Sequence, residues 1–308
     1  MRLVFMGTPE FAVHSLEALV AAGLAPAAVV TAPDKPRGRG QILTPTPVKT
    51  AAVRHGIPVL QPASLKEPST IAGLAALQAD LFVVVAFRIL PESVFTLPPS
   101  GTFNLHASLL PRYRGAAPIN WAIINGERET GVTSFFIEKA VDTGNLILQE
   151  RTAITEDDDA GSLHDRLAAL GAEVVVRTVR LIAAGNAVPI PQDDRTATPA
   201  PKIFPADCRI DWARSPEEVR NFIRGMSPSP GAFTHHHGKT LKIYRSAAKN
   251  AGSVPAPGTV HCDGKTLRVA VQGGWVELLD LQLEGKKRLG VEEFLRGYRL
   301  ASSDRFGD

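Results

Sequence analysis

The alternation of short apolar runs with amphipathic segments over the first 185 residues constrains the fold most. The run DLFVVVAF at 80–87 is rich in β-branched residues, which is typical of a central parallel strand buried on both faces. Further strand-like runs lie at 2–7, 27–32 and 101–108. Helical spacing predicts helices at 9–23 and 160–185, and each ends at a glycine. The alternation predicts a doubly wound, Rossmann-like α/β domain, which binds ligands at the carboxyl ends of its strands.

The composition of the chain changes between residues 186 and 207. The stretch NAVPIPQDDRTATPAPKIFPAD has five prolines and no sustained periodicity, so it is typical of an interdomain linker. One helix at 215–226 and several short strands between Gly, Pro and Asp turns follow it. We therefore expect a first domain over 1–188, a linker over 189–206 and a small all-β, OB-like barrel over 207–308.

Composition excludes several broad classes of protein. An apolar share of 44% with 21% charged residues argues against a disordered chain. No apolar run approaches the ~20 residues that span a bilayer, and the start MRLVFMGTPEF does not fit a signal peptide. Two isolated cysteines fit reduced thiols in the cytoplasm. We expect a cytoplasmic monomer, and a net charge of +3 is too small to establish a nucleic-acid partner.

The turn after the first strand disfavours a nicotinamide dehydrogenase. The sequence there is GTPEFA, and Gly-x-Gly-x-x-Gly is absent. Without the second glycine the backbone cannot approach a pyrophosphate closely.

A basic segment occupies 34–49, with the sequence DKPRGRGQILTPTPVK. Its three prolines and two glycines predict a loop without regular structure. Its cations suit phosphate groups, although a solvated surface loop is an equally good interpretation of this segment alone. The candidate phosphate-binding residues are Lys35, Arg37, Arg39 and Lys49.

Asn104 and His106 lie two apart on a predicted strand, so their side chains share one face. A carboxamide beside an imidazole suits the stabilisation of an oxyanion. Asp142, in a predicted turn between two strands at 131–140 and 145–154, offers a carboxylate for the imidazole. The alternatives are a polar strand end with a core histidine and an ordinary turn aspartate.

The tripeptide HHH at 235–237 raises the question of a metal site. On a strand, His235 and His237 face one side and His236 the other, which gives at most two ligands. We expect no bound metal, because a zinc site needs at least a third protein ligand.

Taken in order, GTPEFA, PDKPRGRGQILTPTPVK, NLHASLLPRYRGAAPINWAI, ETGVTSFFIEKAVDTGN and RIDW resemble the folate-dependent formyltransferase family over essentially the whole chain. The Pro-x-Pro-Val-Lys ending of the basic segment resembles the branch that formylates initiator methionyl-tRNA. The resemblance implies transfer of a formyl group from 10-formyltetrahydrofolate, with Asn104, His106 and Asp142 as the catalytic trio. It also implies that the folate is bordered by two short segments, Ser108, Leu109, Leu110, Pro111 and Arg88, Ile89, Leu90.

The resemblance further implies that the 34–49 segment contacts tRNA together with the OB-like domain. Arg88 departs from the family pattern, which commonly has glycine before Ile-Leu-Pro. Three alternatives remain: a formyltransferase for an amino sugar nucleotide, a formyl-folate hydrolase, and a non-catalytic module that binds single-stranded nucleic acid. The low aromatic content, 6%, disfavours the last, because such modules stack bases on aromatic rings.

Overall fold

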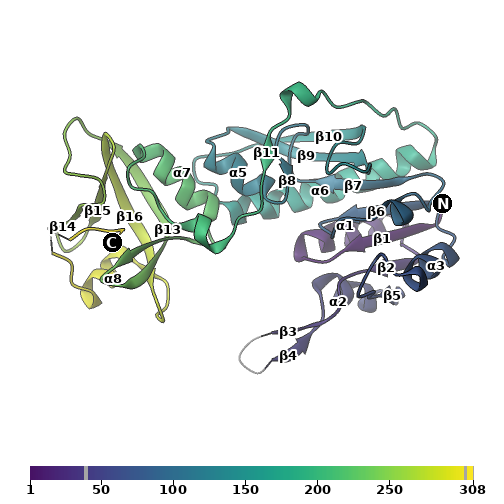
Figure 1. Ribbon diagram of the computed structural model, residues 1–308, viewed down its shortest axis with the longest axis horizontal. Coiled ribbons are helices and arrows are strands. Elements are labelled where there is room, and N and C mark those ends of the chain that lie inside the picture. Colours follow the sequence, from purple (N-terminus) through teal and green to yellow (C-terminus); the bar gives the residue numbers. More distant parts are fainter. Residues whose placement is uncertain (38–40, 302–303, 308) are drawn as a thin grey trace. The chain divides into compact units, whose positions relative to one another are not determined.

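The structure is a computed structural model that describes residues 1–37, 41–301 and 304–307. The chain packs as two compact units, and each is built from several segments (Figure 1). The first comprises Met1–Gly115, Glu129–Ala153 and His164–Ala200. The second comprises Ala116–Arg128, Ile154–Leu163 and Pro201–Asp308.

A seven-stranded sheet in the order β10-β9-β7-β6-β1-β2-β5 forms the centre of the first unit. Strands β7, β6, β1, β2 and β5 are parallel, and β9 and β10 continue the sheet as an antiparallel pair. Their bounds are β1 Leu3–Gly7, β2 Ala28–Val30, β5 Val59–Leu60, β6 Leu81–Val85, β7 Thr102–His106, β9 Glu129–Phe136 and β10 Leu146–Ala153. The predicted doubly wound sheet, with 80–87 at its centre, is confirmed.

Helices join the strands of this sheet, and their apolar faces form its core. They are α1 Glu10–Ala21, α2 Pro47–Arg54, α3 Pro68–Ala76, α4 Glu92–Phe95 and the long α6 Ala160–Ala183. In α1, Phe11, Leu16 and Leu19 are buried at helical spacing, as the sequence predicted. Gly7 ends β1 where a Cβ would lie 2.7 Å from the Cβ of Ala12, so the chain turns tightly into α1.

The prediction that 34–49 lacks regular structure is wrong. Strands β3 (Lys35–Arg37) and β4 (Ile42–Thr44) pair as an antiparallel two-stranded hairpin, and α2 begins at Pro47. Proline is compatible with both elements, because Pro36 lies in an isolated pair of edge strands and Pro47 occupies the first turn of the helix. Thr46 caps α2 by accepting a hydrogen bond from the Lys49 N–H at 3.1 Å.

The proline-rich stretch makes ordered contacts within the first unit. Ile190 forms an antiparallel bridge with Leu146, and β11 (Pro199–Ala200) pairs in parallel with β8 (Arg114–Gly115). The boundaries at 188 and 207 stay a prediction.

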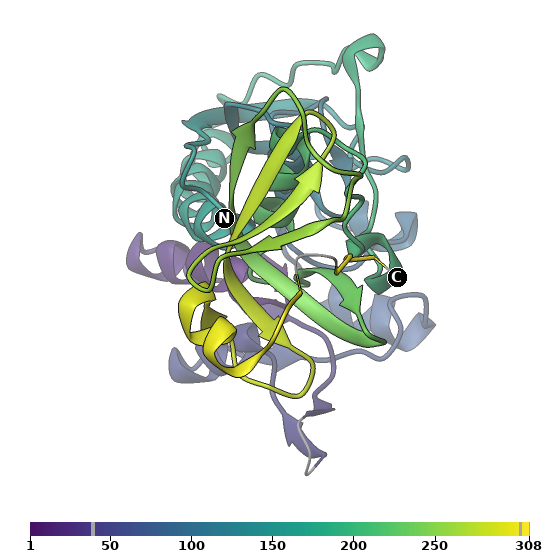
Figure 2. The same ribbon diagram turned by 90° about the vertical axis from the view of Figure 1, so that its left-hand side faces the viewer.

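The second unit contains an antiparallel sheet in the order β12-β13-β16-β15-β14, with β17 paired to β16 (Figure 2). The strands are β12 Ala232–His236, β13 Lys239–Asn250, β14 Val260–Cys262, β15 Leu267–Val271, β16 Gly274–Leu283 and β17 Leu289–Gly290. Helices α5 (Pro118–Ile124), α7 (Pro216–Met226) and α8 (Val291–Gly297) belong to the same unit. A capping box between Ser215 and Glu218 starts α7. The predicted small β-rich second part is confirmed.

Across the described ranges, none of the helices combines the length and apolar character that crossing a membrane requires.

Candidate active site

Asn104 and His106 lie at the carboxyl end of β7, between the parallel strand β6 and the antiparallel strand β9. Asn104 is half-buried, and its side chain has no hydrogen-bond partner among the described residues. His106 is only 6% exposed. The strand spacing thus places an available amide and a nearly buried imidazole at the ligand-binding edge of the sheet.

Both ring nitrogens of His106 face protein atoms. Its Nε2 lies 2.8 Å from the carbonyl oxygen of Tyr113, and its Nδ1 lies 3.8 Å from Oδ2 of Asp142. A carbonyl oxygen only accepts, so Nε2 carries a hydrogen. Nδ1 is therefore the nitrogen that faces the carboxylate of Asp142.

Asp142 is presented by a turn that strongly restricts the local backbone. Its φ is +57°, in the left-handed region that few non-glycine residues adopt. Two residues on, a Cβ at Gly144 would lie 1.7 Å from the carbonyl oxygen of Phe136, so only glycine fits there. Oδ2 of Asp142 also accepts a hydrogen bond from the Gly115 N–H at 2.9 Å, which orients the carboxylate.

Gln192, which lies in the proline-rich stretch, holds this turn in place by hydrogen bonds. Its Nε2 donates to the carbonyl oxygens of Asp142 at 2.9 Å and of Gly144 at 2.8 Å. Its Oε1 accepts from Nε and Nη2 of Arg114 at 3.1 and 2.7 Å, and Arg114 also pairs with Asp194. Gln192 was absent from the predicted site, and no motif in the sequence identifies a carboxamide that acts on backbone carbonyls.

The segment 108–111 follows β7 and is hydrogen-bonded to Thr133 of β9 and to Gln149 of β10. The hydroxyl of Thr133 donates to the Ser108 carbonyl at 2.6 Å and accepts from the Leu110 N–H at 3.2 Å. Ser108 is fully buried, and its hydroxyl donates to the carbonyl of Arg112 at 2.6 Å. Leu110 is 3% exposed, so of these four predicted folate-bordering residues only Leu109 and Pro111 have partly exposed side chains.

The second predicted folate segment follows β6, the parallel neighbour of β7. Arg88 donates to the carbonyls of Pro62 at 2.6 Å and Ala63 at 2.9 Å, and burial lowers the pKa of its guanidinium. Leu90 belongs to the core, whereas Ile89 is 78% exposed. The Arg88 side chain therefore braces a neighbouring loop, while the Ile89 side chain is available to a ligand.

The four predicted tRNA-binding residues differ in their surroundings. Lys35 is exposed on β3, and Arg37 ends that strand. Lys49 forms an ion pair with Asp34 at 2.6 Å, and this hydrogen bond lowers the pKa of Asp34. Arg39 lies outside the described residues.

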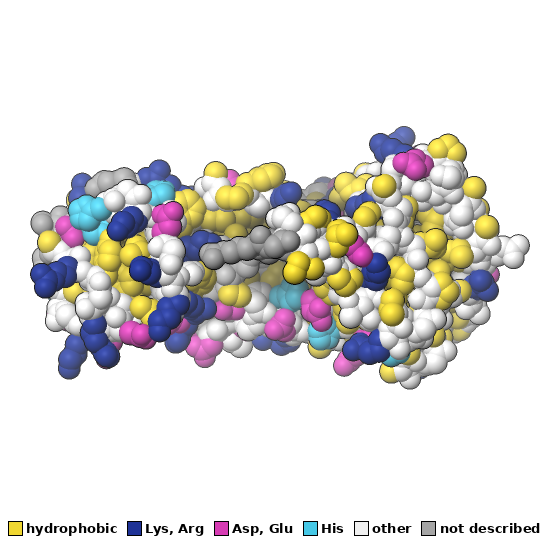
Figure 3. Space-filling view, turned by 90° about the horizontal axis from the view of Figure 1, so that it is seen from below, with side chains coloured by type: hydrophobic (Ala, Val, Ile, Leu, Met, Phe, Trp, Pro, Cys, Tyr) yellow, Lys and Arg dark blue, Asp and Glu magenta, His cyan; other side chains and the backbone are white. Residues whose placement is uncertain are grey.

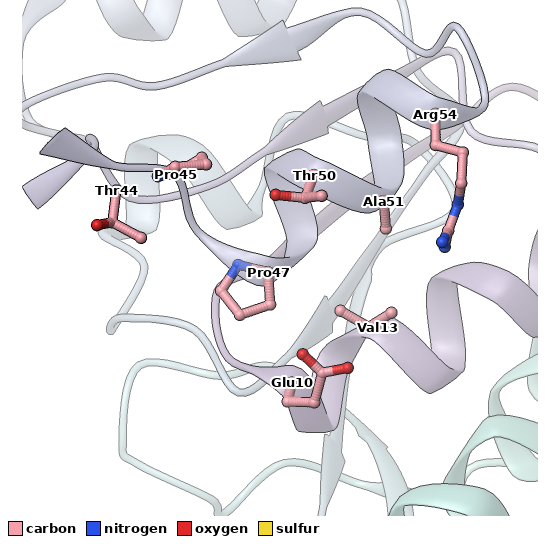
Figure 4. Close-up of a pocket in the computed structure, with 8 residues that line it drawn as sticks. All are labelled: Glu10, Val13, Thr44, Pro45, Pro47, Thr50, Ala51 and Arg54. Carbon is pink, nitrogen blue, oxygen red and sulfur yellow. The ribbon is translucent and has the colours of Figure 1, made fainter. Parts of the chain in front are cut away.

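A pocket of about 380 Å³ lies between α1 and α2, beside the base of the β3–β4 hairpin (Figure 4). Glu10 and Val13 come from α1, and Arg54 lies at the end of α2. The remaining lining residues are Thr44, Pro45, Pro47, Thr50 and Ala51. None of the predicted catalytic residues lines this pocket. The candidate active site is therefore the place near the end of β7 where Asn104, His106 and Asp142 come together, and not this pocket.

The fold and the site together define a two-part protein. Its parallel sheet presents an amide, an imidazole and a carboxylate at the carboxyl edge, and a β-rich unit follows. The family model described as "Formyl transferase" matches residues 1–179, and the one described as "Formyl transferase, C-terminal domain" matches residues 202–299. The chain belongs to the formyl transferase family.

Full-length relatives have close sequence similarity to this chain. A methionyl-tRNA formyltransferase of Geotalea uraniireducens is 48% identical over 100% of this chain and 98% of its own length. One from Geobacter sulfurreducens is 47% identical over 100% of this chain and 97% of its own length.

A solved N-formyltransferase from Helicobacter canadensis, in complex with folinic acid and dTDP-3-aminofucose, has a TM-score of 0.65. It is 20% identical and covers 94% of this chain and 100% of that one. At this identity the likeness supports a common fold.

Proposed function

We propose that this protein transfers the formyl group of 10-formyltetrahydrofolate to the α-amino group of methionine on initiator tRNA. The observation that carries the proposal is the 48% identity, over the full chain, to a relative named methionyl-tRNA formyltransferase. The similar fold of a protein crystallised with folinic acid supports a folate as the formyl donor. In this reaction no metal ion takes part.

The geometry supports division of the chemistry among three side chains. The amine attacks the formyl carbon, and negative charge develops on the formyl oxygen. Collapse of this intermediate breaks the bond between the formyl carbon and N10 of the folate, and N10 takes up a proton as the amine gives one up. Within the part of the chain that the structure describes, the Asn104 amide has no partner, so it donates a hydrogen bond to that oxygen. His106 contributes a second donor if substrate takes the place of one of its two protein contacts.

Asp142 orients His106 and helps to move the proton that the amine gives up toward N10 of the folate. The 3.8 Å between Nδ1 and Oδ2 is too long for a direct hydrogen bond, so this step requires a shortening on substrate binding or one bridging water. The fixed backbone around Asp142 supports such a role, because the carboxylate starts from a single orientation.

Basic and apolar groups on the β3–β4 hairpin support a nucleic-acid acceptor. Beside the exposed Lys35, the hairpin exposes 71% of Ile42 and 67% of Leu43, which a merely solvated loop does not require. Figure 3 shows further Lys and Arg side chains on the face of the second unit. Cations of this kind support contact with the phosphates of tRNA.

One assay tests the proposal directly. Formyl transfer from 10-formyltetrahydrofolate is measured with initiator methionyl-tRNA, uncharged tRNA, a dTDP-linked amino sugar and no acceptor. We expect product only with the charged tRNA. Formylation of the amino sugar would instead establish the sugar nucleotide branch, and donor consumption without an acceptor would establish a hydrolase.

Salt dependence gives an independent check. tRNA binding by the intact protein should weaken steeply with ionic strength, because each phosphate contact releases counterions. Lys35→Ala should reduce the slope of log K against log salt by about 1. A shallow slope would contradict phosphate recognition.

A further inference from the structure

The histidine tripeptide at the end of β12 has an unexpected geometry. His236 is the last residue of the strand, and His237 with Gly238 forms the two-residue turn to β13. Both turn residues have positive φ, +49° at His237 and +72° at Gly238. Strand alternation therefore stops at His237, and the ring centroids of His236 and His237 lie 4.0 Å apart. The expectation that these two histidines face opposite sides is wrong.

The C-terminal segment brings a third potential ligand to the same place. One ligand atom from each of His236, His237 and Asp304 lies within 4.8 Å of the others. Nε2 of His236 is 3.3 Å from Oδ2 of Asp304. Two atoms bound to one tetrahedral zinc ion at about 2.0–2.2 Å lie roughly 3.3–3.5 Å apart. One edge therefore has the length that a zinc site requires. The ligand atom of His237 lies within 4.8 Å of the other two, and its exposed side chain can move closer to them.

Two of the three side chains also have partners that orient them. Nδ1 of His236 lies 2.8 Å from the hydroxyl of Tyr298, and the carboxylate of Asp304 accepts from the Ala301 N–H at 2.8 Å. Protein metal sites commonly orient a ligating histidine through its other nitrogen and a ligating carboxylate through a donor. His236 is 2% exposed, whereas His237 is exposed, so the site is closed on one side and open to solvent on the other.

We propose that His236, His237 and Asp304 bind one divalent transition-metal ion, with Zn²⁺ the best match. Two imidazoles and one carboxylate leave a fourth position for water, which is a coordination that zinc accepts and that Ca²⁺ and Mg²⁺ do not favour. The bound ion would fasten the β12–β13 turn to the C-terminal segment, which is already joined there by the hydrogen bond from Gly307 N–H to the His235 carbonyl. The site is independent of the proposed formyl transfer.

Calorimetric titration of the metal-free, full-length protein with Zn²⁺ tests the site. We expect one ion per chain with an affinity in the micromolar range or tighter, and a Tm that rises with Zn²⁺. Asp304→Asn and His237→Asn should each weaken binding about tenfold or more and remove most of the Tm shift. Asparagine suits position 237 because it tolerates positive φ. His237 is exposed, so this variant remains informative if Asp304→Asn impairs folding.

His235→Ala is the matched control. It removes one histidine from the same tripeptide but leaves the three proposed ligands, so its titration should match that of the unmodified protein. Weakening in His235→Ala equal to that in His237→Asn would show non-specific binding to a histidine-rich strand end. That result, or the lack of saturable binding in the micromolar range, would overturn the proposal.

Discussion

At the scale of single residues, sequence spacing predicts some contacts of the candidate site and not others. The shared face of Asn104 and His106 follows from their separation by two on a strand, and the structure has this arrangement. The approach of Asp142 to His106 was an open alternative from spacing alone, because a distant turn residue has no fixed place before the sheet is assembled. The Tyr113 carbonyl was not predictable at all, since every residue has one.

Asn104→Ala should lower kcat by about 10²–10³ while the far-UV CD spectrum and Tm stay close to those of the unmodified protein. The side chain has no protein partner to lose among the described residues, so the loss reflects only the missing donor to the developing oxyanion. Asn104→Asp keeps the shape and replaces the donor with an acceptor, and it should be impaired at least as much. Near-normal turnover of either variant would remove Asn104 from the mechanism.

Asp142→Asn should lower kcat by about 10² or more with little change in KM for the folate. Asparagine retains the shape of the side chain and tolerates the φ of +57°, so the variant removes the charge without adding backbone strain. Single-turnover formyl transfer measures the chemical step. If Asp142→Asn and the unmodified protein transfer at equal rates, the carboxylate does not support His106.

At the scale of elements, the strands and helices with a strong local pattern were predictable, whereas most of their tertiary partners were not. The β-branched run at 80–87 and the apolar face of α1 are local patterns, and both formed the predicted elements. Prolines were less informative: they were expected to prevent regular structure at 34–49, where a hairpin forms, because Pro36 lies in a strand pair that tolerates it. Residues 189–200 are held in place by hydrogen bonds to residues distant in the sequence, and a local sequence pattern does not predict such bonds.

Gln192→Ala should lower kcat about tenfold and leave KM nearly unchanged, because Gln192 holds the backbone of the Asp142 turn and contacts no substrate in the proposed mechanism. Arg195→Ala is the matched control. Its side chain is 90% exposed and pairs with Asp193, so this variant should behave normally.

A double mutant distinguishes positioning from a general loss of stability. If Gln192 acts through Asp142, the Gln192→Ala substitution should cost little in the Asp142→Asn background, since coupled residues are not additive. Equal, multiplicative losses in both backgrounds would show that Gln192 acts elsewhere.

At the scale of the whole molecule, the second unit is not a continuous C-terminal piece. Its helix α7 packs on α5, where the side chain of Asn120 donates to the Gly225 carbonyl at 2.7 Å. A Cβ at Gly225 would lie 2.6 Å from Ile124, so this contact is close. Arg224 donates to the carbonyls of Thr155 at 3.0 Å and Asp158 at 3.1 Å. The sequence predicted two successive domains from a proline-rich stretch, but it gave no sign that 116–128 and 154–163 pack with the later chain.

This interleaving predicts how the protein responds to a single cut. A protease site inserted after Lys202 should be cleaved readily, because that residue is exposed, yet the two pieces should elute together in size-exclusion chromatography. They remain joined because α7 packs on α5 across the cut, and each piece donates hydrogen bonds to the other: Asn120 to the Gly225 carbonyl, and Arg224 to the carbonyls of Thr155 and Asp158. Gly225→Leu, which forces α5 and α7 apart, should release the 203–308 piece after cleavage. Separation of the pieces without that substitution would mean that residues 203–308 fold without the earlier segments, as two successive domains would.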